Sequence, residues 1–433
     1  MSGRPVPPSR VAVTGAGILC AIADSLETFA AALYSGRSGI GVRSVEATGG
    51  TVLSADLTGF DFPTAVAARA ALPEELRRVA LRVSGRAPLA VRAAVTVALQ
   101  AWEAAELHRV PVAGERIGVV VGGHNLAGAY TERLRPRYDA SPVYLPGRFA
   151  LHMLDTDHVG MVSQILGITG EGFTVGGASA SGNVALINAC RLLAAGEVDV
   201  CLVIGALADL SAMERQAFVN LGAMAGARGT SDPGSRARPF DADREGFVPG
   251  EAAACLVLES AESVRRRGVR PLGGVAGYAL RLDGNSLADP DAAGEARAMA
   301  EALRRAGLNP ADVDYVNSHG TGSRLGDETE VAALHKVFGS DIGRPWVNST
   351  KGLLGHTLWA AGVVEAVATL VQLRDGFVHP NANLEHPIDA ACRFVGTRAQ
   401  RASLRVAMSN AFGFGGFNTS VVLTAAEPAT ESA

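Results

Sequence analysis

A serine stands in a run of small residues, TVGGASASGN at 174–183, between a segment typical of a strand and one typical of a helix. Such a turn can present Ser179 as a nucleophile. A serine hydroxyl stays protonated, however, unless a general base is hydrogen-bonded to it, and Ser181 has the same limitation. The stretch therefore raises two hypotheses: Ser179 attacks a substrate, or it occupies a position where a stronger nucleophile has been lost.

Three other stretches combine glycine with polar residues in apolar surroundings. They are NSHGTGSRLGDETE (317–330), NSTKGLLGHTLWAAGVVE (348–365) and SNAFGFGGFN (409–418), and the first two carry His319 and His356. Each stretch alone is weakly specific. HGTG is also typical of a plain turn, and FGFGG of a strand-end bulge that lets another backbone approach. Their combination is far more specific than any one of them.

The elements that must position these residues alternate between strands and helices. The apolar run RVAVTG (10–15), closed by glycine, predicts a strand, and the next helix is predicted to begin at Asp24, with Glu27 completing a capping box. Further strands are predicted at 116–123 and 198–208, and helices at 88–107 and 183–196.

The second half of the chain repeats this alternation. A strand at 312–320 runs into a loop, and it is followed by helices at 327–339 and 358–376 and by strands at 404–410 and 419–424. Polar or glycine-rich turns stand at the carboxyl ends of strands, where α/β proteins form ligand sites. We predict α/β layers in two similar halves, with a boundary near the charged segment 259–271 and no flexible linker.

Composition limits the class of protein. Hydrophobic residues make up 48% and charged residues 19% of the 433, which predicts a compact chain. A net charge of -4 with scattered basic residues argues against nucleic-acid binding.

The apolar stretches at 200–208 and 358–364 are too short to span a bilayer, and the first ten residues lack an export signal. The last seven residues are expected to fray. Five cysteines without CxxC spacing predict buried thiols in a reducing compartment, so we expect a cytoplasmic protein. The short apolar stretches predict no membrane contact.

These stretches, together with RPFDADREGFVPGE at 238–251, resemble the β-ketoacyl synthases of the thiolase-like superfamily from about residue 10 to residue 425. The resemblance implies a thiolase-like α/β fold with two similar halves in an αβαβα layer arrangement. The N-terminal half, residues 10–258, would carry the nucleophile turn, and the C-terminal half, residues 272–425, the two catalytic histidines, in one rigid unit. A homodimer joined through a strand near FTVGG at 173–177 is also implied.

The resemblance places the family's catalytic positions on particular residues. Ser179 matches the nucleophilic cysteine, whose thiol a helix N-terminus converts to a thiolate. The family supplies no general base there, so the resemblance implies an inactive serine. His319 and His356 match the two histidines that donate hydrogen bonds to the thioester carbonyl of a malonyl group. The other histidines match no motif and are expected to be structural: His108, His124, His152, His158, His335, His379 and His386.

A charged network is implied beside these histidines. Lys351, one of two lysines in the chain, would pair with Glu365 on the following helix and with Asp327 of the LGD motif. The network would position the two histidines and set their protonation.

Substrate-binding positions follow from the same resemblance. Phe412 and Phe414 would wall the malonyl carboxylate, with the Phe414 N–H in a second oxyanion site, although a plain core role for Phe412 fits equally well. Thr321 and Gly415 would complete the set. Arg324 stands where HGTG-type motifs usually continue into proline, which indicates a specialised branch of the family.

A chain that keeps the histidine pair but lacks the thiol is predicted to decarboxylate without condensing. It resembles the Ser-for-Cys ketosynthases of polyketide β-branching, which turn malonyl-acyl carrier protein into acetyl-acyl carrier protein for an HMG-CoA-synthase-like partner. The substrate would be carried on the phosphopantetheine of a carrier protein, and no metal or organic cofactor is implied. Two alternatives stay open: a non-catalytic subunit like the chain-length factors, and a serine-acylated condensing enzyme or acyltransferase, which needs a base near Ser179.

Overall fold

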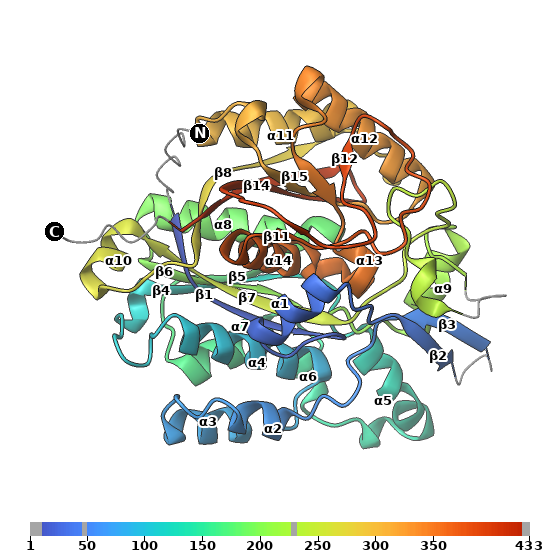
Figure 1. The fold of residues 1–433 in the computed structure, drawn as a ribbon. Helices are drawn as coiled ribbons and strands as arrows, with labels where there is room; N and C mark the ends of the chain where they lie inside the picture. Colours follow the sequence, from blue (N-terminus) through green and yellow to red (C-terminus); the bar gives the residue numbers. More distant parts are fainter. Residues whose placement is uncertain (1–10, 46–49, 227–231, 427–433) are drawn as a thin grey trace.

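The computed structural model describes residues 11–45, 50–226 and 232–426 (Figure 1). The expectations of a missing export signal and of a frayed tail concern segments outside these described residues. No helix within the described ranges is long and apolar enough to cross a membrane. The five cysteines are all buried and free.

The largest sheet contains the same strand arrangement twice. The order is β5-β4-β6-β7-β1 in the first half of the chain and β10-β9-β14-β15-β8 in the second. In both halves the second strand of this order is parallel to its two neighbours, and the other pairings are antiparallel. The strands are β1 (Val11–Cys20), β4 (Ile117–Gly122), β5 (Gly172–Val175), β6 (Val200–Gly205), β7 (Ala252–Ser260), β8 (Gly273–Leu282), β9 (Tyr315–Asn317), β10 (Trp346–Asn348), β14 (Val406–Gly413) and β15 (Phe417–Ala425). The prediction of two similar halves is confirmed.

The two halves meet along β1 and β8. Residues 11–13 of β1 pair antiparallel with residues 273–275 of β8. At the opposite edge of the second half, the short strand β12 (Arg393–Phe394) pairs with β10. Across the described residues this makes one 11-stranded sheet. The short charged helix α10 (Ala261–Arg267) connects β7 to β8.

Two helices lie between the halves of the sheet. α8 (Ser181–Ala195) and α14 (Ala361–Asp375) each contact strands of both halves (Figure 1). α4 (Leu89–Ala104) and α7 (Thr156–Leu166) cover the outer face of the first half, and α11 (Ala292–Ala306) covers that of the second, with α12 (Arg324–Phe338) packed beside it. Almost every side chain of α14 is buried, as expected for a helix packed on all sides. The αβαβα arrangement is confirmed.

The remaining described helices and strands cover the edges of these layers. They are α1 (Leu26–Ser35), α2 (Phe62–Ala67), α3 (Glu74–Ser84), α5 (Gly128–Ala140), α6 (Phe149–His152), α9 (Ala212–Asn220), α13 (Lys351–Leu354), β2 (Gly41–Val45), β3 (Gly50–Ser54), β11 (Phe377–Val378) and β13 (Gln400–Arg401).

The first strand is longer than predicted. It passes through Gly15 and continues to Cys20 instead of ending at residue 15. A Cβ on Gly15 would lie 2.3 Å from the carbonyl oxygen of Ala101, so this glycine lets α4 pack on the strand. Glycine here marks a close approach of two backbones and not the end of an element.

The cap of the helix that follows also differs from the prediction. Ser25 is the N-cap: its Oγ accepts the Thr28 N–H, and the Thr28 Oγ1 accepts the Ser25 N–H. The predicted cap, Asp24 with Glu27, is one residue too early. Asp24 instead accepts a hydrogen bond from the Thr28 hydroxyl at 3.4 Å.

Candidate active site

Ser179 lies on a tight turn at the amino end of α8. β5 leads into the 3-10 turn η3 (Ala178–Ala180), after which α8 begins. Ala178 takes a left-handed conformation with a φ of 48°. Buried Ser181 holds this turn, because its Oγ accepts the Gly177 N–H at 2.9 Å and donates to the Ala178 carbonyl at 2.7 Å. Ser181 is therefore a structural residue.

The FGFGG stretch packs directly against this turn. A Cβ on Gly413 at the end of β14 would lie 2.4 Å from the carbonyl oxygen of Gly177, so only glycine permits the contact. The close backbone approach considered for this stretch is what the structure contains. It joins the last strands of the chain to the turn that carries Ser179.

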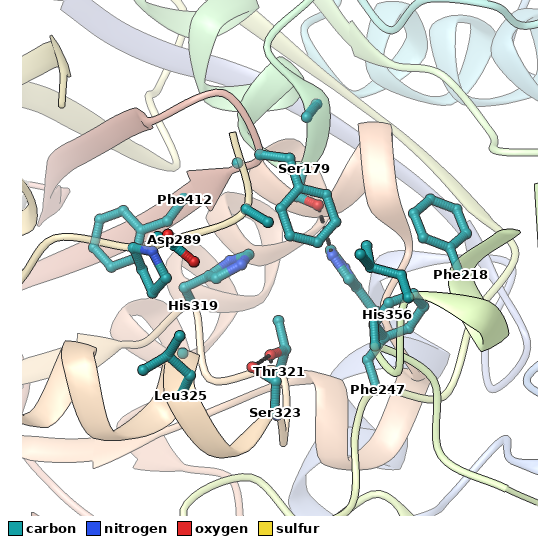
Figure 2. A pocket seen from close by; sticks show the side chains of 18 of the residues that line it. Ser179, Phe218, Phe247, Asp289, His319, Thr321, Ser323, Leu325, His356 and Phe412 are labelled. Carbon is teal, nitrogen blue, oxygen red and sulfur yellow. Dashed lines mark hydrogen bonds between the residues drawn. The ribbon is translucent and has the colours of Figure 1, made fainter. Parts of the chain in front are cut away.

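His319 and His356 come from two loops of the second half and meet opposite Ser179. His319 follows β9, and His356 lies between α13 and the 3-10 turn η7 (Leu358–Ala360). Their ring centroids are 5.6 Å apart and the rings are close to perpendicular. Figure 2 shows both imidazoles turned toward one cavity, with Ser179 hydrogen-bonded to His356.

The hydrogen bond between His356 and Ser179 has a defined direction. The Nε2 of His356 lies 2.8 Å from the Ser179 Oγ, and its Nδ1 accepts the backbone N–H of Leu358 at 3.2 Å. In a neutral imidazole one nitrogen accepts and the other carries the proton. Nε2 must therefore carry the proton and donate it to the Ser179 oxygen.

This geometry corrects the expectation that no base approaches Ser179. An imidazole is within hydrogen-bond distance, yet it faces the serine as a donor. The tautomer that could remove the serine proton would place an N–H on Nδ1 against the N–H of Leu358. His356 therefore does not activate Ser179.

Both histidines are neutral in the folded protein. Burial is the main cause that lowers the pKa of each imidazole well below its usual value, and the charge of Lys351 adds to it. His319 is lowered further by its neighbour His356. Neutral imidazoles can each offer an N–H to an oxygen that gains negative charge.

Lys351 forms a buried ion pair with Glu365 of α14. Burial raises the pKa of Glu365 to about 7, and the lysine charge acts in the opposite direction. The pair lies beside the histidines without a hydrogen bond from Lys351 to either ring among the described residues. Its effect on the imidazoles is therefore one of charge.

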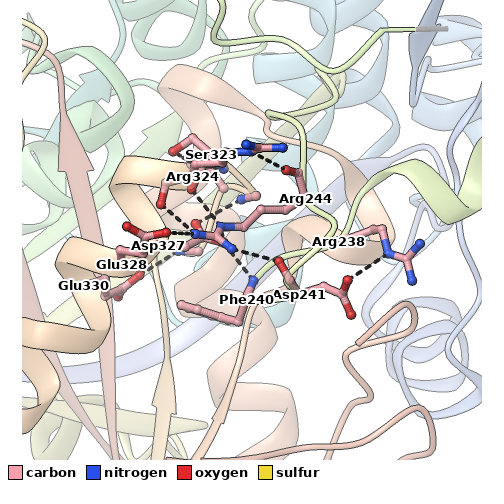
Figure 3. Close-up of polar contacts among 12 residues, drawn as sticks. Arg238, Phe240, Asp241, Arg244, Ser323, Arg324, Asp327, Glu328 and Glu330 are labelled. Carbon is pink, nitrogen blue, oxygen red and sulfur yellow. Dashed lines mark hydrogen bonds and ion pairs between the residues drawn. The ribbon is translucent and has the colours of Figure 1, made fainter. Parts of the chain in front are cut away.

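The expectation that Asp327 belongs to the Lys351 network is wrong. The Asp327 carboxylate accepts the N–H of Phe240 at 2.7 Å and that of Gly322 at 3.1 Å, and it lies 3.7 Å from the Arg244 guanidinium. Figure 3 shows these contacts on the side of α12 that faces the 238–251 loop. Burial raises the pKa of Asp327 to about 7. Asp327 joins two loops and does not touch the histidines.

The acid beneath His319 is Glu330, which sequence reasoning missed. Its two carboxylate oxygens accept the N–H groups of His319 at 2.8 Å and of Gly320 at 2.7 Å. Glu330 stands three residues after Asp327, about one turn along the same face of α12, and that step along the helix brings the two acids to different backbone N–H groups. The only signal in the sequence was its place in the DETE run after HGTG.

The predicted substrate-binding residues occupy different positions around the cavity. Phe412 is buried with its ring 5.6 Å from that of His319, whereas Phe414 is 43% exposed at the rim. Thr321 lines the cavity with its hydroxyl bonded to Ser323. The expectation for Gly415 is wrong, because it does not line the cavity and its N–H donates to the Leu287 carbonyl. Gly415 anchors the neighbouring loop.

The cavity has a volume of about 820 Å³, within the range of small-molecule sites. Its walls are largely apolar and aromatic around the two imidazoles. Besides the predicted residues, the lining includes Phe218, Phe247, Trp359 and His124. Phe247 and Trp359 lie within the stretches 238–251 and 348–365, but no sequence pattern assigned either of them, or Phe218, a role in the site.

His124, which matches no motif and was expected to be structural, lines the cavity. It follows the carboxyl end of β4, the kind of strand end where α/β sites form. That position was the signal that could have identified it.

This arrangement suits the stabilisation of an oxyanion. Two neutral imidazoles lie where a carbonyl oxygen could accept from both, inside an apolar cavity that strengthens such hydrogen bonds. Ser179 receives a proton donor and lacks a base, which disfavours acyl transfer through its hydroxyl.

Known proteins match the chain over almost its whole length. Residues 8–263 match the β-ketoacyl synthase N-terminal domain, and residues 272–385 match the β-ketoacyl synthase C-terminal domain. The polyketide biosynthesis malonyl-ACP decarboxylase PksF of Bacillus subtilis is 38% identical over 415 residues, which cover 95% of this chain and 96% of that protein.

Solved structures agree with these sequence matches. The ishigamide ketosynthase/chain length factor has a TM-score of 0.83 at 28% identity and covers 97% of this chain and 100% of its own. The type II polyketide synthase ketosynthase AntDE, solved with the acyl carrier protein AntF, has a TM-score of 0.83 at 25% identity, with 96% and 100% coverage.

Proposed function

The chain belongs to the β-ketoacyl synthase family, and we propose that within this family it is a malonyl-acyl carrier protein decarboxylase. The reaction converts a malonyl thioester to an acetyl thioester and carbon dioxide. The similarity to the malonyl-ACP decarboxylase PksF supports this activity. The observation that carries the proposal is the hydrogen bond from the His356 Nε2 to the Ser179 oxygen. Its direction means that His356 presents an N–H donor to the cavity and does not activate Ser179 as a nucleophile.

The histidine pair would stabilise the charge that develops during decarboxylation. When the bond between C2 and the carboxylate breaks, its electron pair moves toward the thioester carbonyl oxygen and carbon dioxide leaves. The N–H groups of His319 and His356 would bind that oxygen, with the thioester taking the place of Ser179 as acceptor for His356. A preformed donor of this kind lowers the barrier by about 3 to 4 kcal/mol. The aromatic walls would keep water away from the reacting group.

Condensation would be prevented at Ser179. A condensing enzyme first holds an acyl chain on its nucleophile, and a serine without a general base is a poor nucleophile. The enolate would then meet no acyl electrophile, so protonation would end the reaction.

The wider setting follows from the same proposal. The AntDE structure holds a carrier protein against a ketosynthase, which supports a phosphopantetheine-bound substrate delivered by an acyl carrier protein. We place the activity in polyketide β-branching, ahead of an HMG-CoA-synthase-like partner, and expect a cytoplasmic homodimer. Five buried free thiols fit a reducing compartment. The two N–H donors supply the charge stabilisation, so the reaction should need no metal or organic cofactor.

A chain-length-factor-like subunit is the second candidate. The ishigamide structure, a ketosynthase/chain length factor, has the same fold. A subunit without catalysis has no need of two neutral imidazoles in one cavity or of a buried lysine that lowers their pKa values. These features favour the enzyme.

The direct test uses malonyl-loaded carrier protein and intact mass spectrometry. Incubation with the purified chain should remove the mass of carbon dioxide from the carrier-bound group and leave an acetyl group. An unchanged malonyl mass would disprove the decarboxylase. A covalent acyl mass on the enzyme itself would instead support the serine-acylated alternative.

A further inference from the structure

The proposed decarboxylation, on which this inference rests, requires a proton that the histidine pair does not supply. After carbon dioxide leaves, C2 of the enolate must gain a proton before the product is an acetyl group. His356 carries one proton on Nε2, which it donates to an oxygen, and its Nδ1 accepts a backbone N–H. Loss of that proton would leave an imidazolate in a buried site. The proton for carbon must come from another group.

The shape of the cavity indicates where C2 lies. Four large apolar side chains of the lining are more than two-fifths exposed and mark the mouth: Leu221, Leu287, Leu325 and Phe414. The thioester sulfur carries the long pantetheine arm and must point toward this mouth. C2 is bonded to the other side of the same carbonyl carbon, so it points inward, toward Ser179 and Trp359.

His124 is at this inner end. Its ring packs on that of Trp359 with centroids 4.4 Å apart, and a Cβ on Gly176 would lie 3.2 Å from its Cδ2. Gly176 is three residues before Ser179, and Trp359 is three residues after His356. The imidazole therefore lies between the two loops that carry the site.

The backbone around His124 is held firmly. The N–H groups of the next two residues, Asn125 and Leu126, donate to the Asp155 carboxylate at 2.8 and 2.9 Å. Asn125 takes a left-handed conformation with a φ of 53°, which a surrounding structure must stabilise. By contrast, neither ring nitrogen of His124 has a hydrogen-bond partner among the described residues. The loop fixes the position of an imidazole whose nitrogens are free for a ligand.

We propose that His124 is the general acid that protonates C2 of the enolate, directly or through one water. The imidazolium gives up one ring proton, C2 gains it, and the acetyl thioester results. His124 is half-buried, so solvent can return the proton to the neutral ring before the next turnover.

Glu295 is the rival donor in the same cavity. It is 1% exposed, and burial together with Glu330 and Asp283 raises its pKa well above the usual value, which favours the protonated acid. It lies on α11 among carboxylates, and the first of these is Glu330, the acid beneath His319. A buried acid that holds its proton so strongly is a slow donor and is hard to recharge from solvent.

The donor can be identified by the fate of the enolate. Malonyl-pantetheine serves as the probe, in buffer that contains ¹³CO₂ and ¹³C-bicarbonate. In wild-type enzyme, fast protonation should give acetyl-pantetheine and leave the remaining malonyl group unlabelled. In His124→Gln we expect acetyl formation to fall about 10²-fold, the usual contribution of a general acid. The longer-lived enolate should recapture ¹³CO₂, so the malonyl group should gain one mass unit.

Matched variants separate chemistry from packing. His124→Phe keeps the ring contact with Trp359 and should behave as His124→Gln does. His335→Gln removes an imidazole that pairs with Asp389 outside the cavity, and it should match wild type. A variant that merely distorts the site would slow decarboxylation without labelling the malonyl group.

The pH dependence of wild type gives a test without substitution. Burial lowers the pKa of His124 below 6.5, whereas the Asp155 and Glu214 carboxylates act in the opposite direction. His319 and His356, which share the cavity, are neutral. The protonated fraction of His124 therefore falls as pH rises, so ¹³C labelling of the malonyl group, divided by the concentration of dissolved ¹³CO₂, should increase between pH 6 and pH 9.

Each outcome decides one of the two proposals. An inactive wild type would overturn the proposed function and this inference with it. An active wild type with unchanged His124→Gln and His124→Phe would overturn the inference alone. Labelling in Glu295→Gln but not in His124→Gln would transfer the role to Glu295. Labelling in both His124 variants but not in His335→Gln supports His124.

Discussion

The Nε2 of His356 lies 2.8 Å from the Oγ of Ser179, and the backbone of Leu358 decides which of the two donates. In a hydrolytic triad the histidine accepts the serine proton. Here the Leu358 N–H occupies Nδ1, so the proton of the neutral ring is on Nε2 and points at the serine. The same two side chains therefore form an oxyanion-type donor and not a nucleophile pair.

Removal of either imidazole should cost far more than removal of the serine hydroxyl. We expect His319→Ala or His356→Ala to lower carbon dioxide release about 10²- to 10³-fold, because each removes a donor to the developing oxyanion. Ser179→Ala should retain most of the activity, since Ser179 only accepts a hydrogen bond. Intact mass of malonyl-loaded carrier protein, followed over time, measures all three. Equal losses in Ser179→Ala and His356→Ala would contradict this assignment.

A thiol at residue 179 should become reactive. In Ser179→Cys, the helix N-terminus and the His356 N–H would both stabilise a thiolate and lower the pKa of the new cysteine. We expect one rapid iodoacetamide adduct near pH 7, detected by intact mass. Wild type is the control, because its own cysteines are buried, and burial raises the pKa of Cys190 to about 12. Equal labelling of wild type and variant would show that the position does not activate a thiol.

Glu330 should support His319 through the backbone. In Glu330→Gln the amide NH₂ would face the N–H of His319 or Gly320, and one unsatisfied buried donor costs about 1 to 3 kcal/mol of unfolding free energy. Displacement of the His319 ring should also lower decarboxylation by about 10²-fold. Urea unfolding and the carrier-protein assay measure the two effects. Glu328→Gln, on the same helix and 65% exposed, should change both far less.

The stability of the fold should depend on pH through His379. This buried imidazole contacts the Thr350 hydroxyl at 3.1 Å, next to Lys351, and burial lowers its pKa from 6.5 to about 4. Between pH 6.5 and pH 4 the unfolded chain binds this proton and the folded chain does not. The unfolding free energy therefore keeps its full value above pH 6.5 with respect to this group. It decreases as pH falls from 6.5 to 4, by up to about 3 kcal/mol.

Urea unfolding of wild type and His379→Gln at pH 7 and pH 4.5 isolates this effect. The other titrating groups are common to both proteins, so the stability difference between them should shrink toward the lower pH. A difference that stays constant would show that His379 titrates alike in the folded and unfolded chains.

The charged residues of the site were harder to predict than the elements that carry them. The Lys351 and Glu365 side chains do meet, whereas Asp327 faces Phe240 and Gly322 and Glu330 takes the place beneath His319. Asp327 and Glu330 lie one turn apart on α12. A sequence pattern shows that both acids are on one helix, but which acid faces which loop depends on how the helix packs.

His124 illustrates a second limit. The strand that precedes it, β4, was predicted from its apolar run, but no motif identified the residue after it as part of the site. Its role depends on contact with Trp359, which is distant in the sequence and is placed by a different half of the fold. Side chains brought together by packing leave no local pattern.

The sequence by itself determined the layered α/β fold, the repeat of its two halves and the residue types at the site, because apolar periodicity and short motifs are local properties. Only the tertiary structure decided how Ser179 and His356, 177 residues apart, meet. The direction of their hydrogen bond depends on the N–H of Leu358, which a left-handed turn with a φ of 50° aims at the far side of the ring. Leu358 begins η7, which packs against the turn that carries Ser179.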